Sequence, residues 1–176
     1  MPTTSRIWKA AAFSSSSDTS SARPRGRRIK LDMTMDNEKL PTSFEPKQML
    51  VLRKDQKVRK GKHVSQGAHG AVKGILQLGS RVVHDGVPGV FIPTGGPETL
   101  LSQWIDGQHK KICVSVNSEV ELYAGHEKAL ALGINSVLII DSGLTEFNLV
   151  PTPTAVALGP DAPALLDQVT GLLQPL

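Results

Sequence analysis

In MLVLRKDQKVRKGKHVSQGAHGAVKGILQL, residues 49–78, a short apolar run gives way to a polar loop and then to a helical pattern. The run Met49–Leu52 predicts a strand that ends at Arg53. A helix from about Lys62 to Leu78 with one buried apolar stripe is predicted by helical spacing at Val64, Ala68, Ala71, Val72 and Ile75. Three glycines lie inside this helix, where each costs about 1 kcal/mol relative to alanine. They indicate close approach by a neighbouring backbone or a ligand.

The remaining segments continue this alternation of strands and helices. Residues 79–96 are rich in Gly, Pro and Val and predict an irregular insertion or a hairpin. Three further helices are expected. The first starts at Pro97 and includes residues 98–104, the second is opened by a Ser118–Glu121 capping box and ends before Gly133, and the third is capped by Asp161 and reaches about Thr170. Three further strands are expected at 111–116, 136–140 and 154–158. Four strands in this order imply an α/β domain with a mixed sheet covered by helices.

Charge is distributed unevenly along the 176 residues. The net charge of +4 lies in residues 1–40, which hold eight Lys/Arg and four Asp/Glu, whereas residues 41–176 hold twelve of each. Six basic residues against Asp55 occupy the stretch from Arg53 to Lys62. Such a cluster is a docking signal for a polyanion, although a solvated loop is the ordinary alternative.

The single cysteine, Cys113, excludes an internal disulfide and lies in a strand-like stretch, so we expect a buried, inert thiol. No run approaches the roughly 20 apolar residues that span a bilayer.

Residues 1–45 form a Ser-rich, basic stretch without apolar periodicity, and residues 46–176 form the predicted domain. Three interpretations of the first segment remain open. It is an organellar transit peptide, a disordered basic arm, or a segment upstream of a true start at Met33 or Met35. The first interpretation predicts a mitochondrial or other organellar location, and the other two a cytoplasmic one.

Two candidate segments lie where a ligand site is expected, at the carboxyl ends of strands. Lys62, Gln66 and His69 share one face of the first helix, and Asp141 begins the segment Asp141-Ser142-Gly143-Leu144-Thr145 after a strand. A carboxylate beside a lysine can orient a water for acyl transfer. The ordinary alternative is a solvent-facing Lys and Gln, a packed His, and a strand-end Asp that closes a turn.

Several other sites are excluded by sequence. The Gly61-Lys62 pair is not a Walker loop, because Gln56 replaces the first glycine and His63 replaces Ser or Thr. No Gly-x-Ser-x-Gly elbow exists, and the five histidines show no metal-ligand spacing.

Four stretches in the same order resemble the archaeal and eukaryotic type of peptidyl-tRNA hydrolase. They are Lys57-Val58-Arg59-Lys60-Gly61-Lys62-His63-Val64-Ser65-Gln66-Gly67-Ala68-His69-Gly70-Ala71, Trp104-Ile105-Asp106-Gly107-Gln108, Asp141-Ser142-Gly143-Leu144-Thr145, and Thr152-Pro153-Thr154 with Leu158-Gly159-Pro160. Leu144 replaces a residue that is usually basic or polar, and the loop 146–151 is about one residue longer than in the family.

The resemblance implies a three-layer α/β/α domain around a four-stranded mixed sheet, often dimeric, without cofactor or metal. It implies hydrolysis of the ester between a peptide or an N-blocked amino acid and the 3′ ribose of tRNA. By motif, the catalytic candidates are Lys62, Gln66, Asp141 and Thr145. Lys62 would support the developing oxyanion or the terminal phosphate, Gln66 and Thr145 would position the carbonyl or the water, and Asp141 would keep Lys62 charged or orient the water.

The remaining family positions concern tRNA contact and packing. Lys57, Arg59 and Lys60 would contact phosphates of the tRNA, and His69 would be structural or accessory. Two alternatives are a non-catalytic adaptor that binds tRNA or another RNA and a hydrolase of a different acyl ester or amide. The hydrolase interpretation requires that the Lys62 ammonium and the Asp141 carboxylate face a common cleft.

Overall fold

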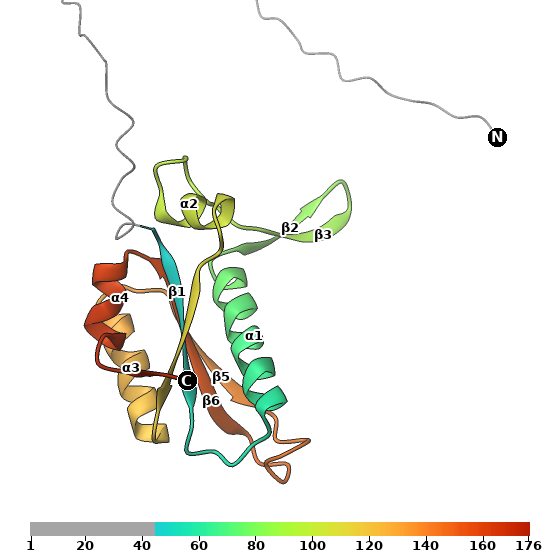
Figure 1. Cartoon of the computed structure of the whole chain (residues 1–176). Helices are drawn as coiled ribbons and strands as arrows, with labels where there is room; N and C mark the ends of the chain where they lie inside the picture. Colours follow the sequence, from blue (N-terminus) through green and yellow to red (C-terminus); the bar gives the residue numbers. More distant parts are fainter. Residues whose placement is uncertain (1–44) are drawn as a thin grey trace, which may run out of the picture. The chain divides into compact units, whose positions relative to one another are not determined.

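The computed structural model describes residues 45–176, so the predicted tail lies outside the described residues, Glu45 excepted. The elements are, in chain order, β1 (Lys47–Arg53), α1 (Lys60–Leu76), β2 (Ser80–His84), β3 (Val87–Phe91), α2 (Leu100–Asp106), β4 (Lys111–Val116), α3 (Glu119–Ala131), β5 (Ser136–Asp141), β6 (Thr152–Asp161), α4 (Pro163–Thr170) and β7 (Gln174–Pro175). Figure 1 shows their arrangement. The domain is of the α/β class, as predicted.

The main sheet is mixed and has five strands in the order β5-β6-β1-β4-β7. Only β1 and β4 are parallel neighbours, and the other three pairs are antiparallel. The prediction of four strands is wrong because it misses β7. This strand has two residues, one of them a proline, so it carries no alternating pattern by which a sequence could reveal it.

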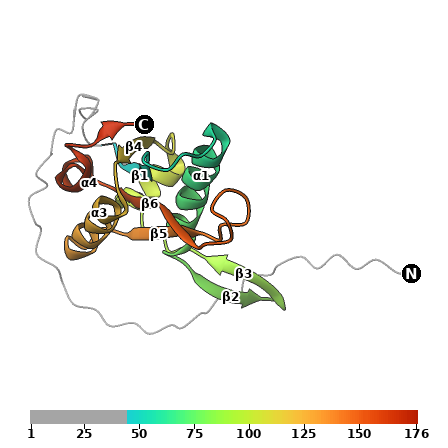
Figure 2. The same cartoon turned by 90° about the horizontal axis from the view of Figure 1, so that it is seen from below.

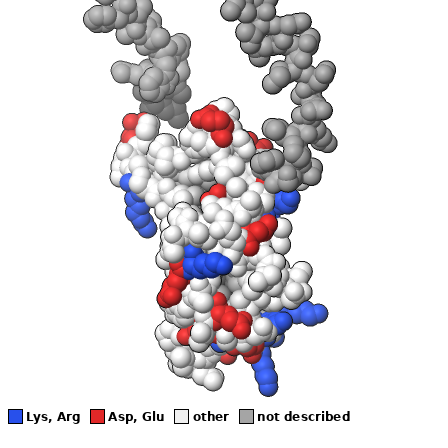
Figure 3. Space-filling model, turned by 90° about the vertical axis from the view of Figure 1, so that its left-hand side faces the viewer, with Lys and Arg blue, Asp and Glu red and all other residues white. Residues whose placement is uncertain are grey.

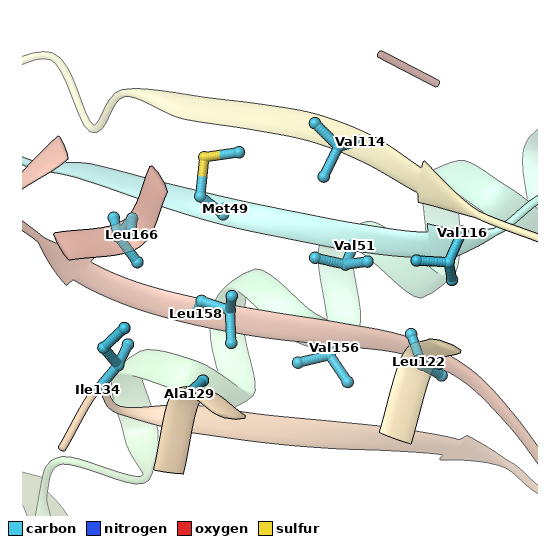
Figure 4. Close-up of a cluster of buried hydrophobic side chains, with 10 residues drawn as sticks. All are labelled: Met49, Val51, Val114, Val116, Leu122, Ala129, Ile134, Val156, Leu158 and Leu166. Carbon is cyan, nitrogen blue, oxygen red and sulfur yellow. The ribbon is translucent and has the colours of Figure 1, made fainter. Parts of the chain in front are cut away.

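Helices cover both faces of the sheet. Helix α1 lies over β5, β6 and β1, while α3 and α4 lie on the opposite face, as Figure 2 shows from below. Alternate residues of β1 point to opposite faces, so Met49 and Val51 enter the core beneath α3 and α4 (Figure 4), and Leu50 and Leu52 enter the core beneath α1. A strand buried on both faces reads as the continuous apolar run seen in the sequence.

Helix α1 buries a different face from the one predicted. Val64 and Val72 of the apolar stripe are 73% and 60% exposed, whereas the buried residues are Gln66, Gly67, Gly70 and Gly74. The glycines allow the helix backbone to approach the sheet. A Cβ at position 70 would lie 3.3 Å from the Ala157 Cβ, which is closer than an ordinary van der Waals contact. The prediction of close backbone approach is confirmed, and that of a buried apolar stripe is wrong.

Other sequence predictions hold with shifts of a few residues. Residues 80–91 form a hairpin whose residues are all exposed. Helix α2 begins at Leu100, after an N-cap at Thr99, rather than at Pro97. The Ser118 hydroxyl accepts from the Glu121 N–H as a capping box requires, but the Glu121 carboxylate accepts from the Asn117 N–H instead of returning to Ser118.

Two smaller predictions are wrong. Asp161 is the last residue of β6 rather than a helix cap, and the N-cap of α4 is Ala162. Cys113 is exposed rather than buried, because α1 packs over β5, β6 and β1 and leaves that face of β4 open. The Cys113 thiol therefore lines a groove beside α1.

None of the helices between residues 45 and 176 is both long and apolar enough to cross a membrane.

Candidate active site

The candidate site forms where the start of α1 meets the loop that follows β5. Strands β1 and β5 are each antiparallel to β6, which lies between them, so both run in the same direction and end at the same edge of the sheet. Helix α1 begins shortly after β1 ends, and Asp141 closes β5. The topology therefore brings these two segments together although nearly 80 residues separate them in the chain. This agrees with the location expected for ligand sites in α/β sheets.

Lys62 and Asp141 form an ion pair at this edge of the sheet. The distance between Lys62 Nζ and Asp141 Oδ2 is 2.6 Å, and the two side chains are only 12% and 11% exposed. Lys62 Nζ also lies 3.1 Å from Thr145 Oγ1. The expected juxtaposition of ammonium and carboxylate is thus present, and the catalytic role of these residues stays a prediction.

Both carboxylate oxygens of Asp141 accept further hydrogen bonds. The Gln66 side-chain amide donates to Oδ2 at 2.6 Å, and the Gly143 N–H donates to Oδ1 at 2.8 Å. Gly143 has a φ of +80°, and a Cβ at this position would collide with the Val150 backbone, so only glycine suits this turn. The structure therefore brings Lys62, Gln66, Asp141 and Thr145 into one connected network.

Thr154 of β6 belongs to the same network and was not among the predicted site residues. Its hydroxyl lies 2.8 Å from Gln66 Oε1 and donates to it, and both side chains are buried. This bond fixes the Gln66 amide so that its NH₂ group faces Asp141. The sequence places Thr154 in a family-like stretch, but only the pairing of β6 between β1 and β5 shows what it contacts.

Asp141 is held in its charged form. Desolvation alone would raise its pKa, but hydrogen bonds from Lys62, Gly143 and Gln66, together with the Lys62 charge, outweigh this effect. The pKa of Asp141 therefore lies below the usual carboxyl value. A carboxylate of this kind is a weak proton acceptor at neutral pH, and it is well suited to orienting a donor.

The loop after Asp141 contacts the basic segment before α1. Arg59 Nε donates to Glu146 Oε1 at 2.7 Å, and this bond holds the pKa of the Glu146 carboxyl below its usual value. The Phe147 ring centroid lies 5.5 Å from Lys62 Nζ, within the range of a cation–π contact. The Arg59 side chain remains 82% exposed beside this partner, so its contact with tRNA phosphates stays a prediction.

The other two predicted tRNA contacts, Lys57 and Lys60, differ from Arg59 in their surroundings. Lys57 and Lys60 are exposed, and neither forms an ion pair with the residues that the structure describes. His69 is also exposed, with Nε2 3.3 Å from Ser65 Oγ, which favours an accessory role over a structural one.

Together, the fold and this network define an α/β enzyme domain with a lysine–carboxylate site suited to acyl-transfer chemistry. Among residues 45–176, no three His, Cys, Asp or Glu side chains gather as a metal site. The family model for "Peptidyl-tRNA hydrolase PTH2" matches residues 46–176. The chain therefore belongs to the PTH2 family of peptidyl-tRNA hydrolases.

Archaeal relatives agree with this assignment. A peptidyl-tRNA hydrolase of Pyrobaculum aerophilum is 34% identical over 132 residues, which cover 74% of this chain and 98% of the relative. One of Thermococcus onnurineus is 38% identical over 133 residues, with coverage of 74% and 98%. One of Methanocaldococcus jannaschii is 34% identical over 129 residues, with coverage of 73% and 97%.

Proposed function

We propose that this protein hydrolyses the ester between a peptide, or an N-blocked amino acid, and the 3′ ribose of tRNA. It would thereby recycle peptidyl-tRNA that has stalled in translation. The observation that carries the proposal is the 2.6 Å contact between Lys62 and Asp141 at the carboxyl ends of the strands, in a chain of the PTH2 family.

In the proposed reaction, a water molecule adds to the ester carbonyl and the ribose oxygen leaves. The products are a peptide carboxylate, a tRNA with a free 3′ hydroxyl, and a proton that passes to solvent. Lys62 stabilises the negative charge that develops on the carbonyl oxygen. Thr145, which is exposed and 3.1 Å from Lys62 Nζ, positions the water or the carbonyl.

Asp141 and Gln66 act mainly by holding this arrangement. The lowered pKa of Asp141 makes it a poor base, so we assign it to keeping Lys62 charged and to orienting the water. Gln66 is 2% exposed and bonded at both ends of its amide, to Thr154 and to Asp141. We therefore assign Gln66 to positioning Asp141 rather than to contact with the substrate.

The tRNA would bind at the basic segment that leads into α1, with Lys57 and Lys60 on its phosphates. Such contacts are salt-sensitive and largely independent of sequence. The side that α3 and α4 cover, which Figure 3 views, does not offer a comparable site, because these two helices hold four acidic residues and one lysine, Lys128.

The proposal extends to the organisation of the protein. Residues 46–176 form the catalytic domain, a three-layer α/β/α unit in which α1 belongs to the layer that carries catalytic candidates. Residues 1–45 form a separate basic segment. The protein acts in the cytoplasm, or in an organelle if that segment is a transit peptide, and it forms a homodimer. Light scattering and mass spectrometry of the mature N-terminus test the last two points.

Hydrolysis of N-acetyl-aminoacyl-tRNA by the purified full chain tests the function. Lys62→Ala and Asp141→Ala are each expected to lower kcat/KM at least about tenfold, a barrier change of roughly 1.4 kcal/mol or more. Lys128→Ala and Glu127→Gln, on the exposed surface of α3, serve as controls for the change in charge. Undiminished turnover in both site variants would show that the site is wrong, and absence of turnover in the wild type would refute the function.

A further inference from the structure

A groove beside α1 begins at the candidate catalytic residues and continues over apolar side chains. Its volume is about 620 Å³, and Gln66 and Asp141 line one part of it. The remaining wall includes Val72, Leu76 and Ile140, which are 60%, 47% and 54% exposed. Large apolar side chains that are exposed together next to a polar site indicate a binding surface.

The groove on the other side of α1 lacks this connection. It has a volume of about 680 Å³ and lies between α1 and β4, with Val64 and Cys113 in its wall. None of Lys62, Gln66, Asp141 or Thr145 lines it. Two grooves therefore flank the helix. The one on the β4 side is lined by Lys60, a predicted tRNA contact, whereas the one between α1 and β5, which also has His69 and Lys73 in its wall, reaches Gln66 and Asp141.

The length of this groove suits a short stretch of peptide. Gln66 and Leu76 are ten residues apart on α1, which corresponds to about 15 Å along the helix axis. An extended chain advances about 3.3 Å per residue, so this distance spans about four residues.

The edge of β5 limits how such a peptide can bind. Gln77 Nε2 donates to the Ser136 carbonyl at 3.1 Å, and Lys73 Nζ donates to the Leu138 carbonyl at 3.3 Å. These carbonyls lie on the free edge of the sheet, and each accepts a hydrogen bond from a side chain of α1 or of its C-cap residue. Binding by addition of a strand is thus blocked along this part of β5, and recognition through apolar side chains remains.

The direction of the substrate follows from the charges at the start of α1. Lys57 and Lys60 lie at or before the first turn of the helix, and the groove runs from Gln66 toward the last turn at Leu76. An ester whose tRNA side faces the lysines and whose carbonyl lies at Lys62 and Asp141 directs its acyl side along the groove.

We propose that the groove between α1 and β5 binds the last few residues of the esterified peptide and prefers apolar side chains there. This inference rests on the proposed hydrolase function. It adds that the enzyme selects substrates by the apolar character of these last residues. In the groove, Ile140 lies nearest the ester and Leu76 furthest from it.

The test compares acyl groups carried by the same tRNA. The full-length wild type is expected to cleave N-acetyl-leucyl-tRNA with a kcat/KM about tenfold above that for N-acetyl-glycyl-tRNA, since a partly open apolar pocket discriminates at the low end of the usual range. Ile140→Thr is expected to reduce this ratio at least about threefold, mainly through KM. Leu76→Asn is expected to reduce the advantage of an N-acetyl-tetraleucyl group over N-acetyl-leucine.

The matched control is Val64→Thr, an exposed residue of the other groove, which should leave both ratios unchanged. A wild-type ratio near one, or an equal loss in Val64→Thr, would overturn the inference while leaving the hydrolase function intact. Failure to cleave any of these esters would instead refute the function itself.

Binding of the free product N-acetyl-tetraleucine provides an arm that does not depend on turnover. Methyl NMR signals of Ile140 and Leu76 should shift on titration while those of Val64 stay in place. Shifts confined to Val64 would place the peptide in the wrong groove and overturn the inference.

Discussion

At the scale of single residues, the site depends on a chain of hydrogen bonds from β6 to α1 to β5. Thr154 orients Gln66, Gln66 and Gly143 orient Asp141, and Asp141 holds Lys62. Each buried polar side-chain atom of this hydrogen-bond network has a partner, which matters because an unpaired buried group costs about 1–3 kcal/mol.

Thr154→Val should remove the first hydrogen bond of this network, the one from the Thr154 hydroxyl to Gln66. Gln66 Oε1 would lose its donor, so we expect the free energy of unfolding to fall by about 1–3 kcal/mol. The freed amide could turn away from Asp141, so kcat should fall with little change in KM. Urea unfolding and steady-state kinetics measure the two effects, and Thr154→Ser, which keeps the hydroxyl, should restore both. If Thr154→Val retains full kcat, Thr154 does not position the site.

The lowered pKa of Asp141 predicts how the contribution of this residue to stability varies with pH. Because its folded pKa lies below the unfolded value of about 3.9, ionised Asp141 stabilises the folded state fully at pH values above about 5. That contribution is lost as the pH falls from there through the folded pKa. The difference in free energy of unfolding between wild type and Asp141→Asn should therefore narrow between pH 7 and pH 3. A difference that stays constant over this range would contradict the assignment.

These residues also show what a sequence can and cannot predict about a site. Lys62 and Asp141 were predictable because a strand end and a following helix start are recognisable locally, and sheet topology then joins them. Thr154 was not, because its role depends on which strand lies between β1 and β5. The assignment of Arg59 to phosphate rests on its charge, which is visible in the sequence, and it stays a prediction. Its hydrogen bond to Glu146 was not predictable, because Glu146 lies 87 positions away.

At the scale of elements, α1 is a helix whose buried, sheet-facing side consists of three glycines and Gln66. Apolar periodicity identified the helix and its ends to within two residues, but it assigned the wrong buried face. Periodicity measures where apolar side chains lie and does not measure how closely a backbone approaches its neighbour. The apolar stripe that it marked lies largely in the two grooves beside the helix.

Alanine substitutions should distinguish glycines required for packing from those that are not. A Cβ at position 67 would lie 3.7 Å from Leu50 Cδ1, an ordinary contact, so Gly67→Ala should stabilise the fold by about 1 kcal/mol through helix propensity. A Cβ at position 74 would lie 3.1 Å from Nε2 of the fully buried Gln48. That amide donates to the Ala71 carbonyl, so Gly74→Ala should disturb a buried hydrogen bond.

We therefore expect Gly74→Ala to be less stable than Gly67→Ala by about 1–2 kcal/mol. Chemical denaturation of the two variants measures this difference directly. Equal stabilisation by both substitutions would mean that the helix can move away from the sheet, and that the glycines do not fix its position.

At the scale of the whole molecule, opposite charges occupy different segments of the described domain. Basic residues concentrate between Arg53 and Lys62, and from residue 112 onward seven acidic residues accompany one lysine. The acidic residues are distributed around the fold, and one of them, Glu146, reaches the basic segment and pairs with Arg59. In the proposed tRNA complex, the binding surface would therefore depend both on where the lysines lie and on which basic side chains pair with carboxylates of the protein itself.

The dependence of tRNA affinity on salt should separate these two classes of basic residue. Each phosphate contact contributes a slope of about 0.7–0.9 to the plot of log affinity against log salt. Lys57→Ala and Lys60→Ala should each reduce the slope by about that amount, because both side chains are exposed and unpaired within residues 45–176. Arg59→Ala should change it less, since Glu146 already holds the guanidinium.

Glu146→Gln provides the decisive comparison, because it removes the competing carboxylate and leaves the side-chain size nearly unchanged. Arg59 then becomes available to phosphate, so tRNA should bind more tightly and the slope should steepen by about one contact. Filter binding at several salt concentrations measures both quantities. In Glu146→Gln combined with Arg59→Ala the gain should disappear; a gain that persists would show that Glu146 repels the tRNA directly rather than by occupying Arg59.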